Sequence, residues 1–165
     1  MEENNLGVLL PEMRLDFWDA LWNGQIKSPS ALNRRLKVLE LPTDADAPCC
    51  RCVLRLRHGD AYLEQRWRYG RDRLRVAVGN LLPREDSGVL YGVCRLTPRH
   101  IYVLACAMPG TDEATLVEHA NRDIASLIGS METYLNLESE LKEIVPLESL
   151  AKLLEKEPPA PETPV

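Results

Sequence analysis

The apolar residues of this chain recur at two spacings, one typical of helices and one typical of strands. Over residues 6–22 the spacing of three and four predicts an amphipathic helix, which Pro11 interrupts. Ser28 and Pro29 then suit the N-cap and the first turn of a second helix. Together these two helices form a helical lead-in that we expect to span residues 1–42.

Two apolar runs in the middle of the chain predict a β-hairpin. Every position from residue 101 to residue 108 is apolar, so this strand should be buried on both faces and lie inside a sheet. Residues 88–96 form the partner strand. The sequence Thr97-Pro98-Arg99-His100 joins the two, and the fixed φ of proline suits the second position of a tight turn.

The remaining pattern predicts two strands and two long helices around this hairpin. In chain order they are a strand at 50–57, a helix at 61–82, a helix that Thr111 caps and that runs to Leu135, and an edge strand at 138–145. A short helix at 147–157 should follow. Residues 158–165 are acidic and rich in proline, which predicts a disordered tail.

After the lead-in, the predicted elements follow the order strand, helix, strand, strand, helix, strand. This is the ferredoxin-like βαββαβ order. Right-handed crossovers would arrange the strands as fourth, first, third, second, with the strand at 101–108 in the interior. The predicted fold is therefore α+β, a ferredoxin-like antiparallel sheet over residues 43–157. Since the two long helices cover one face, the lead-in, the terminal helix or a second subunit should cover the other.

Composition narrows the class of protein without naming a reaction. The chain is 45% hydrophobic and 27% charged, with a net charge of −5, as in ordinary soluble proteins. It has no apolar run long enough for a membrane span, and Met1-Glu2-Glu3 does not resemble a signal peptide, so we expect a cytoplasmic location and no membrane partner. Cys49, Cys50 and Cys52 have no second ligand pair at zinc spacing, so no metal or cofactor is expected.

The first helix carries the candidate interface. Exposed aromatic and aliphatic stripes usually mark contacts, so we expect a partner surface, and a homodimer, at the large residues of this helix. They are Met13, Phe17, Trp18, Leu21 and Trp22. The basic cluster of the second helix is too small to favour direct DNA recognition over this interpretation.

The candidate ligand site consists of arginines. Residues 51–75 hold eight arginines against three acids. Alternation along the predicted strand puts Arg51, Arg55 and Arg57 on one face, and Arg95 lies on the hairpin. Guanidinium groups suit phosphate or carboxylate, so these four could hold a small anion or a nucleotide. For the arginines of the following helix, a solvated face with ion pairs is the simpler interpretation.

Two stretches resemble a known family. Residues 10–26, with the sequence LPEMRLDFWDALWNGQI, resemble the segment entering the central domain of AraC-type two-component response regulators. Residues 96–104 are similar to the hairpin of that domain, and the resemblance extends over residues 9–156. It implies a degenerate GGDEF module, related in fold to nucleotide cyclases. In that family the module lies between a phosphorylatable receiver and an AraC-type DNA-binding domain.

This chain departs from the catalytic members of that fold. A working diguanylate cyclase carries a Gly-Gly-acid-Glu-Phe signature at the hairpin, where this chain has Thr97-Pro98-Arg99-His100. It also needs acidic ligands for Mg²⁺ at the end of the first strand, where this chain has Arg55-Leu56-Arg57-His58. No catalytic residue is therefore assigned.

The resemblance implies a non-catalytic regulatory and dimerisation domain that serves bacterial signal transduction and transcription regulation. Neither the receiver nor the DNA-binding domain is expected within these 165 residues, so DNA would be contacted only through the latter. Two alternatives stay open: a module that senses a small anion or nucleotide, and a residual cyclase-type enzyme.

Overall fold

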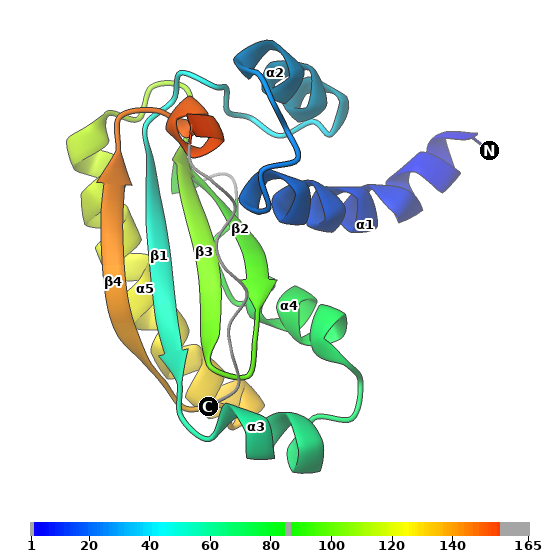
Figure 1. The fold of residues 1–165 in the computed structure, drawn as a ribbon, viewed down its shortest axis with the longest axis vertical. Helices are drawn as coiled ribbons and strands as arrows, with labels where there is room; N and C mark the ends of the chain where they lie inside the picture. Colours follow the sequence, from blue (N-terminus) through cyan, green and yellow to red (C-terminus); the bar gives the residue numbers. More distant parts are fainter. Residues whose placement is uncertain (1, 85–86, 156–165) are drawn as a thin grey trace.

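Four antiparallel strands form one open sheet in the computed structural model, which describes residues 2–84 and 87–155 (Figure 1). The strands are β1 (Cys49–Leu56), β2 (Val89–Leu96), β3 (His100–Ala107) and β4 (Ser139–Leu147). Their order across the sheet is β2-β3-β1-β4, so the predicted strand order is confirmed. The fold is α+β. Among the described residues, no helix has both the length and the apolar character that crossing a membrane requires.

The interior position predicted for β3 is also confirmed. Val103 pairs with Cys52 of β1 on one side and with Val93 of β2 on the other. All residues of β3 from Val103 to its end are buried. The uninterrupted apolar run therefore reflects a strand that is covered on both faces.

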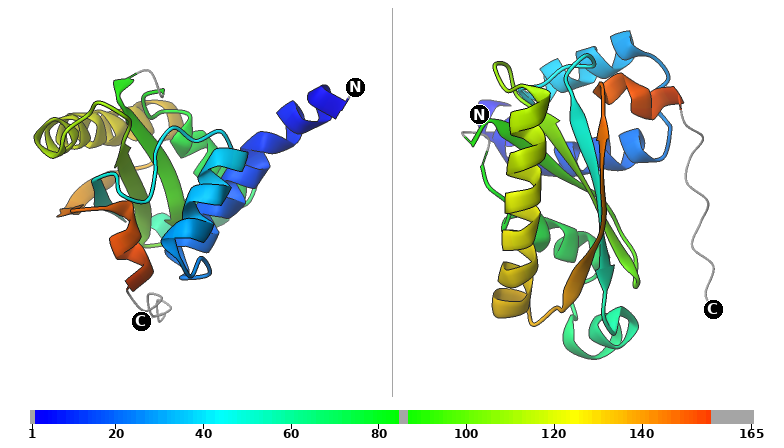
Figure 2. Two further views of the ribbon diagram at one scale, coloured as in Figure 1. Left: turned by 90° about the horizontal axis from the view of Figure 1, so that it is seen from above. Right: turned by 90° about the vertical axis from the view of Figure 1, so that its left-hand side faces the viewer.

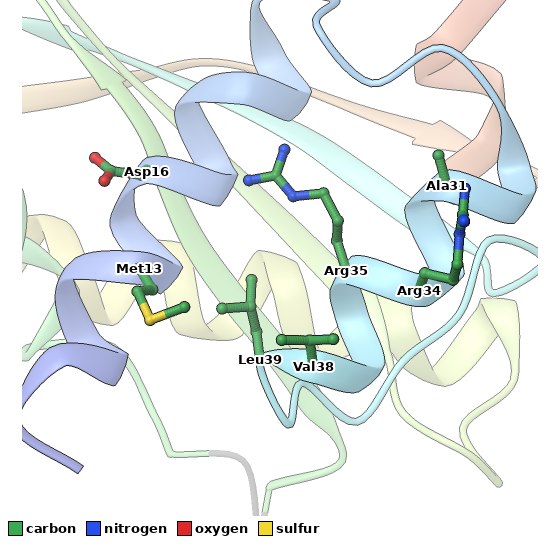
Figure 3. A pocket seen from close by; sticks show the side chains of 7 residues that line it. All are labelled: Met13, Asp16, Ala31, Arg34, Arg35, Val38 and Leu39. Atoms are coloured by element: carbon green, nitrogen blue, oxygen red, sulfur yellow. The ribbon is translucent and has the colours of Figure 1, made fainter. Parts of the chain in front are cut away.

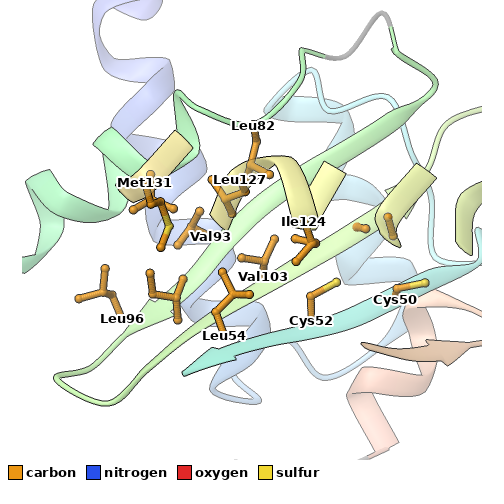
Figure 4. Packing of buried hydrophobic residues seen from close by; sticks show 14 of the residues in the cluster. Cys50, Cys52, Leu54, Leu82, Val93, Leu96, Val103, Ile124, Leu127 and Met131 are labelled. Carbon is orange, nitrogen blue, oxygen red and sulfur yellow. The ribbon is translucent and has the colours of Figure 1, made fainter. Parts of the chain in front are cut away.

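One face of the sheet is covered by α5 (Glu113–Leu135) and α4 (Arg71–Gly79), and Figure 4 shows the core between them. Ile124 and Met131 of α5 are fully buried against Val103 and its neighbours. The cap of α5 is Asp112, whose carboxylate accepts a hydrogen bond from the Thr115 backbone N–H at 2.7 Å. The predicted cap, Thr111, was therefore one residue too early.

The other face is covered by the chain's own lead-in, as Figure 2 shows. The helices α1 (Glu2–Trp22) and α2 (Pro29–Val38) pack there with a short 3₁₀ helix, η3 (Leu150–Glu155). Contact is close enough that a Cβ atom on Gly92 would lie 2.2 Å from the Trp18 ring. A glycine in β2 thus makes room for the indole of α1.

The first helix is longer than expected, because α1 continues through Pro11. Proline removes one intrahelical hydrogen bond, and that loss does not end a helix whose later residues are anchored in a core. The second helix begins as predicted, with the Ser28 hydroxyl accepting a hydrogen bond from the Ala31 N–H at 3.1 Å, and it ends at Val38.

The single helix predicted over residues 61–82 is wrong. The structure has a short helix, α3 (Gly59–Ala61), a π-helical turn, η1 (Tyr62–Arg66), and then α4 as a separate helix. Between them Trp67 is extended and its indole N–H donates to the Gly70 carbonyl at 2.7 Å. Gly70, the N-cap of α4, has φ +88°, a non-helical conformation that favours glycine. The apolar spacing persists across the break because both pieces pack on the same core.

The end of the described chain corrects one further expectation. The strand β4 is an edge strand, as predicted, but it extends to Leu147 and includes Pro146, which edge strands tolerate. The helix expected at 147–157 is the shorter 3₁₀ helix η3. The predicted tail at 158–165 lies outside the described residues.

Candidate binding surfaces

Three of the five predicted interface residues are buried inside the chain. Phe17, Trp18 and Leu21 are 0%, 5% and 1% exposed and pack on the sheet, so assigning them to a partner surface is wrong. An amphipathic stripe predicts an apolar contact but does not say whether the contact lies within the chain. Met13 remains 37% exposed and Trp22 is half-buried.

A buried arginine joins α1 to the rest of the molecule. Arg75 of α4 is 4% exposed, and its guanidinium donates to the Asp19 carboxylate of α1 at 3.0 Å. It also donates to the Val93 and Cys94 carbonyls of β2 at 2.8 and 3.2 Å. These carbonyls lie where the register of β2 shifts in a β-bulge. One side chain thus links two helices and an irregular edge strand.

An open groove separates α1 from α2 (Figure 3). Its volume is about 570 Å³. Met13 and Asp16 line it from α1, and α2 contributes basic and apolar side chains. The lining from α2 and the residue that follows it comprises Ala31, Arg34, Arg35, Val38 and Leu39. Val38 is 68% exposed, so the groove presents apolar surface to solvent.

Three of the four predicted ligand-binding arginines share one face of the sheet. Arg51 pairs with Leu104, and Arg55 pairs with His100. Arg95 pairs with Tyr102, because the bulge in β2 shifts its register there. Cross-strand partners project from the same face, so these three side chains lie on the face that carries the lead-in.

This part of the face combines cations with aromatic rings. The Arg51 guanidinium lies 5.8 Å from the centre of the Trp22 ring, an attractive cation–π geometry. Trp22 in turn lies 5.1 Å from Tyr102, and Tyr102 lies 5.8 Å from His100, measured between ring centres. The Trp22 indole N–H and the Arg51 Nε–H are buried without a hydrogen-bond partner within the protein. We call Trp22, Arg51, Arg55, Arg95, His100 and Tyr102 the arginine–aromatic face.

Acids and a lysine border the arginine–aromatic face on β4. Glu143 pairs with Val53 and Glu140 pairs with Arg55 across the sheet. Lys142 Nζ lies 3.5 Å from His100 Nε2. The charges of β4 therefore offset part of the positive field of β1, and a ligand would interact with both signs.

The fourth predicted arginine, Arg57, has a different environment. It follows the last residue of β1, is exposed, and forms an ion pair with Glu140 at 3.5 Å. It lines a cavity of about 230 Å³ together with His58 and Arg66. The structure thus associates Arg57 with the loop after β1 rather than with the middle of the sheet face.

The end of β1 and the hairpin turn are in direct contact. The Leu56 N–H donates to the Arg99 carbonyl at 2.7 Å. A Cβ atom on Gly59 would lie 1.8 Å from the Pro98 carbonyl oxygen, so only glycine fits there. The Thr97 hydroxyl accepts hydrogen bonds from the Arg99 and His100 N–H groups at 3.2 and 3.0 Å. Backbone therefore fills the space between the strand end and the turn.

The cysteines are buried rather than reactive. All five are free thiols inside the chain, and among the described residues no group of three or more potential metal ligands is present. Burial raises the pKa of Cys50 to about 11, with Glu113 adding a smaller effect, and raises that of Cys52 to about 12. These thiols stay protonated near neutral pH, which disfavours both metal binding and nucleophilic chemistry.

A second buried polar pair was not predicted from the sequence. The Tyr91 hydroxyl of β2 donates to the Asp123 carboxylate of α5 at 2.5 Å. Burial and this hydrogen bond raise the pKa of Tyr91 well above its usual value. Arg122 also donates to Asp123, at 3.1 Å. The sequence carries one signal for this pair: Asp123 lies within an apolar stripe, one helical turn after Ala120, and a buried acid needs a hydrogen-bond partner.

The chain was compared with protein-family models, curated proteins and solved structures, and none of them matches it significantly.

Proposed function

We propose that this chain is a non-catalytic regulatory and dimerisation domain of a bacterial AraC-family two-component response regulator. Its ferredoxin-like fold would be a degenerate form of the GGDEF module. The resemblance of residues 10–26 and 96–104 supports this assignment, and so does the strand order β2-β3-β1-β4. The domain relays a signal to a DNA-binding domain outside these residues.

The contact between Gly59 and Pro98 is the observation that best supports the proposal that this domain is not catalytic. In a cyclase, the metal and nucleotide groups would be held between the end of the first strand and the hairpin. Here the Pro98 carbonyl lies against Gly59, and the Leu56 N–H donates to the Arg99 carbonyl. That space is occupied by the chain's own backbone, which supports a regulatory rather than a catalytic role.

The contacts of α1 suggest how the domain relays a signal. By the family resemblance, a receiver would precede α1. Arg75 joins Asp19 of α1 to the bulge in β2, so displacement of α1 would strain buried hydrogen bonds in the sheet. A discrete buried contact of this kind can couple two elements.

Two experiments test the regulatory assignment. The chain is incubated with GTP and Mg²⁺ or Mn²⁺, and its association state is measured by light scattering across a wide concentration range. We expect no nucleotide product and a dimer. Turnover would contradict the non-catalytic part and support the residual cyclase, whereas a monomer at all concentrations would contradict the dimer part.

The flanking coding sequence tests the class of protein. A receiver before Met1 and an AraC-type helix-turn-helix after Val165 are expected. Free-standing termini would contradict the assignment.

A second candidate function is anion or nucleotide sensing on the arginine–aromatic face. The observation that favours it is that Arg51, Arg55 and Arg95 share one face with aromatic rings, which suit a phosphate and a planar base. Calorimetry against nucleotides should give heat that Arg55→Ala with Arg95→Ala abolishes. Arg71→Ala with Arg73→Ala on α4 is the matched control. No heat with the unmodified chain would exclude this function.

A further inference from the structure

We propose that the arginine–aromatic face binds the acidic, proline-rich segment that follows η3 in the same chain. The segment is residues 157–164, with the sequence EPPAPETP. This inference goes beyond the proposed function, because it assigns an intramolecular occupant to a face that the lead-in leaves uncovered. It does not depend on whether the domain dimerises.

The described chain ends on the same side of the sheet as the arginine–aromatic face. The helix η3 lies on that side, opposite α5, as Figure 2 shows. Its start is fixed to the loop before β1, because the Leu150 N–H donates to the Ala47 carbonyl at 2.8 Å. Near its end, Leu154 packs against the same buried cluster as Trp22 of the face. The segment therefore begins on the side of the sheet where the arginines lie.

The segment is long enough to cross the face. Arg51 and Arg55 are four residues apart on β1, which corresponds to about 13 Å. Proline-rich sequences favour the polyproline II conformation, in which eight residues span about 25 Å. A tether this short also keeps the local concentration of the segment in the range of about 1 mM, so a weak contact is sufficient for docking.

The charges of the face and of the segment are complementary. Arg51, Arg55 and Arg95 lie on the face, and none of the ion pairs found among the described residues involves them. The segment holds two acids, Glu157 and Glu162, and no base. In polyproline II these acids are about 15 Å apart, close to the separation of the two arginines along β1. Carboxylates and guanidinium groups form strong, directional hydrogen bonds.

The aromatic rings and polar groups of the face also suit a proline-rich segment. Trp22 and Tyr102 lie 5.1 Å apart between ring centres, and aromatic grooves are the usual binding surface for polyproline II. The Trp22 indole N–H and the Arg51 Nε–H have no hydrogen-bond partner among the described residues. Carbonyl groups of a polyproline II segment make no internal hydrogen bonds, so they can accept from such donors. A segment of this composition has no core of its own and orders only against another surface.

Docking of the segment would restrain whatever is attached to it. In the proposed function a DNA-binding domain follows Val165, so the connection to that domain would be held against the sheet. A nucleotide bound to the arginine–aromatic face, the second candidate function, would compete with the segment for the same arginines. Release of the segment would then lengthen the tether of the DNA-binding domain.

NMR relaxation of the complete, ¹⁵N-labelled chain tests the docking, because it reports on the segment itself. In the unmodified chain, the backbone amides of Ala160 and Thr163 should have order parameters of about 0.8, as in folded backbone. Values below about 0.6 would mean that the segment is not docked and would overturn the inference. Values that rise with protein concentration would show that the segment binds a second copy, and would overturn it as well.

Charge reversal tests whether the arginines hold the segment. One variant carries Arg55→Glu with Arg95→Glu, and a second carries Glu157→Lys with Glu162→Lys. Each places like charges in contact, so we expect each to lower the order parameters of the segment below about 0.6. The variant with all four substitutions restores opposite charges and should recover the high values. If either pair alone leaves the segment ordered, or if the four together do not restore order, the inference is wrong.

A matched control separates this contact from a general effect of charge. Arg71→Glu with Arg73→Glu on exposed α4 changes the net charge equally and should leave the segment ordered. Circular dichroism checks the fold of the variants, and the one with Glu157→Lys and Glu162→Lys changes no described residue. A mobile segment in the unmodified chain would leave the regulatory assignment standing. Turnover of GTP or a strictly monomeric chain would contradict that assignment without affecting this inference.

Discussion

The two faces of the sheet are covered in different ways. On one face α5 runs along the strands, and the core between α5 and the sheet is mostly aliphatic. On the other face α1 crosses the strands and packs aromatic side chains such as Phe17 and Trp18. The lead-in leaves part of that face uncovered, and the arginine–aromatic face lies there.

This difference separates the part of the molecule that defines the fold from the part that we propose responds to partners. The α5 side buries the cross-strand pairs that fix the register of the sheet. The lead-in side packs on the sheet through a separate buried cluster, and Arg75 links its helix α1 to α4 and β2. The first half of α1 extends away from the sheet. Elements of lower local stability are those that move when a partner binds. We therefore expect the lead-in to open before the α5 side does.

The largest effect is expected from the α5 core. Ile124→Ala removes a fully buried side chain between α5 and the sheet and should lower the free energy of unfolding by about 4 kcal/mol. Urea denaturation measures it by circular dichroism. Leu36→Ala is the matched change on α2. As urea increases in this variant, the fluorescence of the lead-in indoles Trp18 and Trp22 should change at a lower urea concentration than the circular dichroism signal of the helices. Coincident transitions in Leu36→Ala would show that both faces unfold as one unit.

The second largest loss of stability is expected from removing Arg75, which links α1 on one side of the sheet to α4 on the other. Arg75→Ala leaves the Val93 and Cys94 carbonyls without their donor and should cost about 3 kcal/mol. Hydrogen exchange should increase in α1 and β2 more than in α5. Arg73→Ala, on the exposed side of the same helix, should change stability by less than about 0.5 kcal/mol. Equal exchange increases throughout the chain would contradict a local role.

Buried cysteines lie on both faces of the sheet, so their thiols can be used to probe the stability of each face. Cys50 and Cys52 pack on the α5 side, and Cys94 and Cys106 pack on the lead-in side. A thiol whose pKa is raised from 9.0 to about 11, as in Cys50, stabilises the fold fully below pH 9, and that stability is lost as the pH rises through about 11. We expect a loss of roughly 2 kcal/mol for this thiol.

Labelling distinguishes the two groups of thiols. In low urea at pH 8, a thiol reagent should modify Cys94 and Cys106 before Cys50 and Cys52, as mass spectrometry of peptides would show. The reverse order would mean that the α5 side opens first.

Features of the fold that depend on local sequence patterns could be predicted, whereas those that depend on long-range packing could not. The interior position of β3 and the strand order follow from local patterns, because apolar runs and short connections leave few arrangements of a four-stranded sheet. The break at Gly70 could not be predicted in this way. Both halves of the predicted helix face one core, so the apolar spacing does not change where the backbone does.

The candidate sites show a similar limit. Alternation along β1 correctly put Arg51 and Arg55 on one face. Arg95 joins them only because a β-bulge shifts the register of β2, and no residue type in β2 marks that bulge. Arg75 resembles the neighbouring exposed arginines in the sequence, and its burial depends on how α4 is oriented after the break. Long-range geometry, rather than residue type, decides which arginine is solvated.

The smallest change in stability is expected from removing a helix cap, and each side of the sheet has one helix with such a cap. Ser28 caps α2 and Asp112 caps α5, and each accepts a hydrogen bond from a backbone N–H in the first turn. Replacing either by alanine should cost about 1 kcal/mol of helix stability. Asp112→Ala should lower the midpoint of global unfolding, because α5 belongs to the part that defines the fold. Ser28→Ala should instead raise hydrogen exchange in α2 with little change in that midpoint, so equal shifts in both variants would remove the distinction between the two faces.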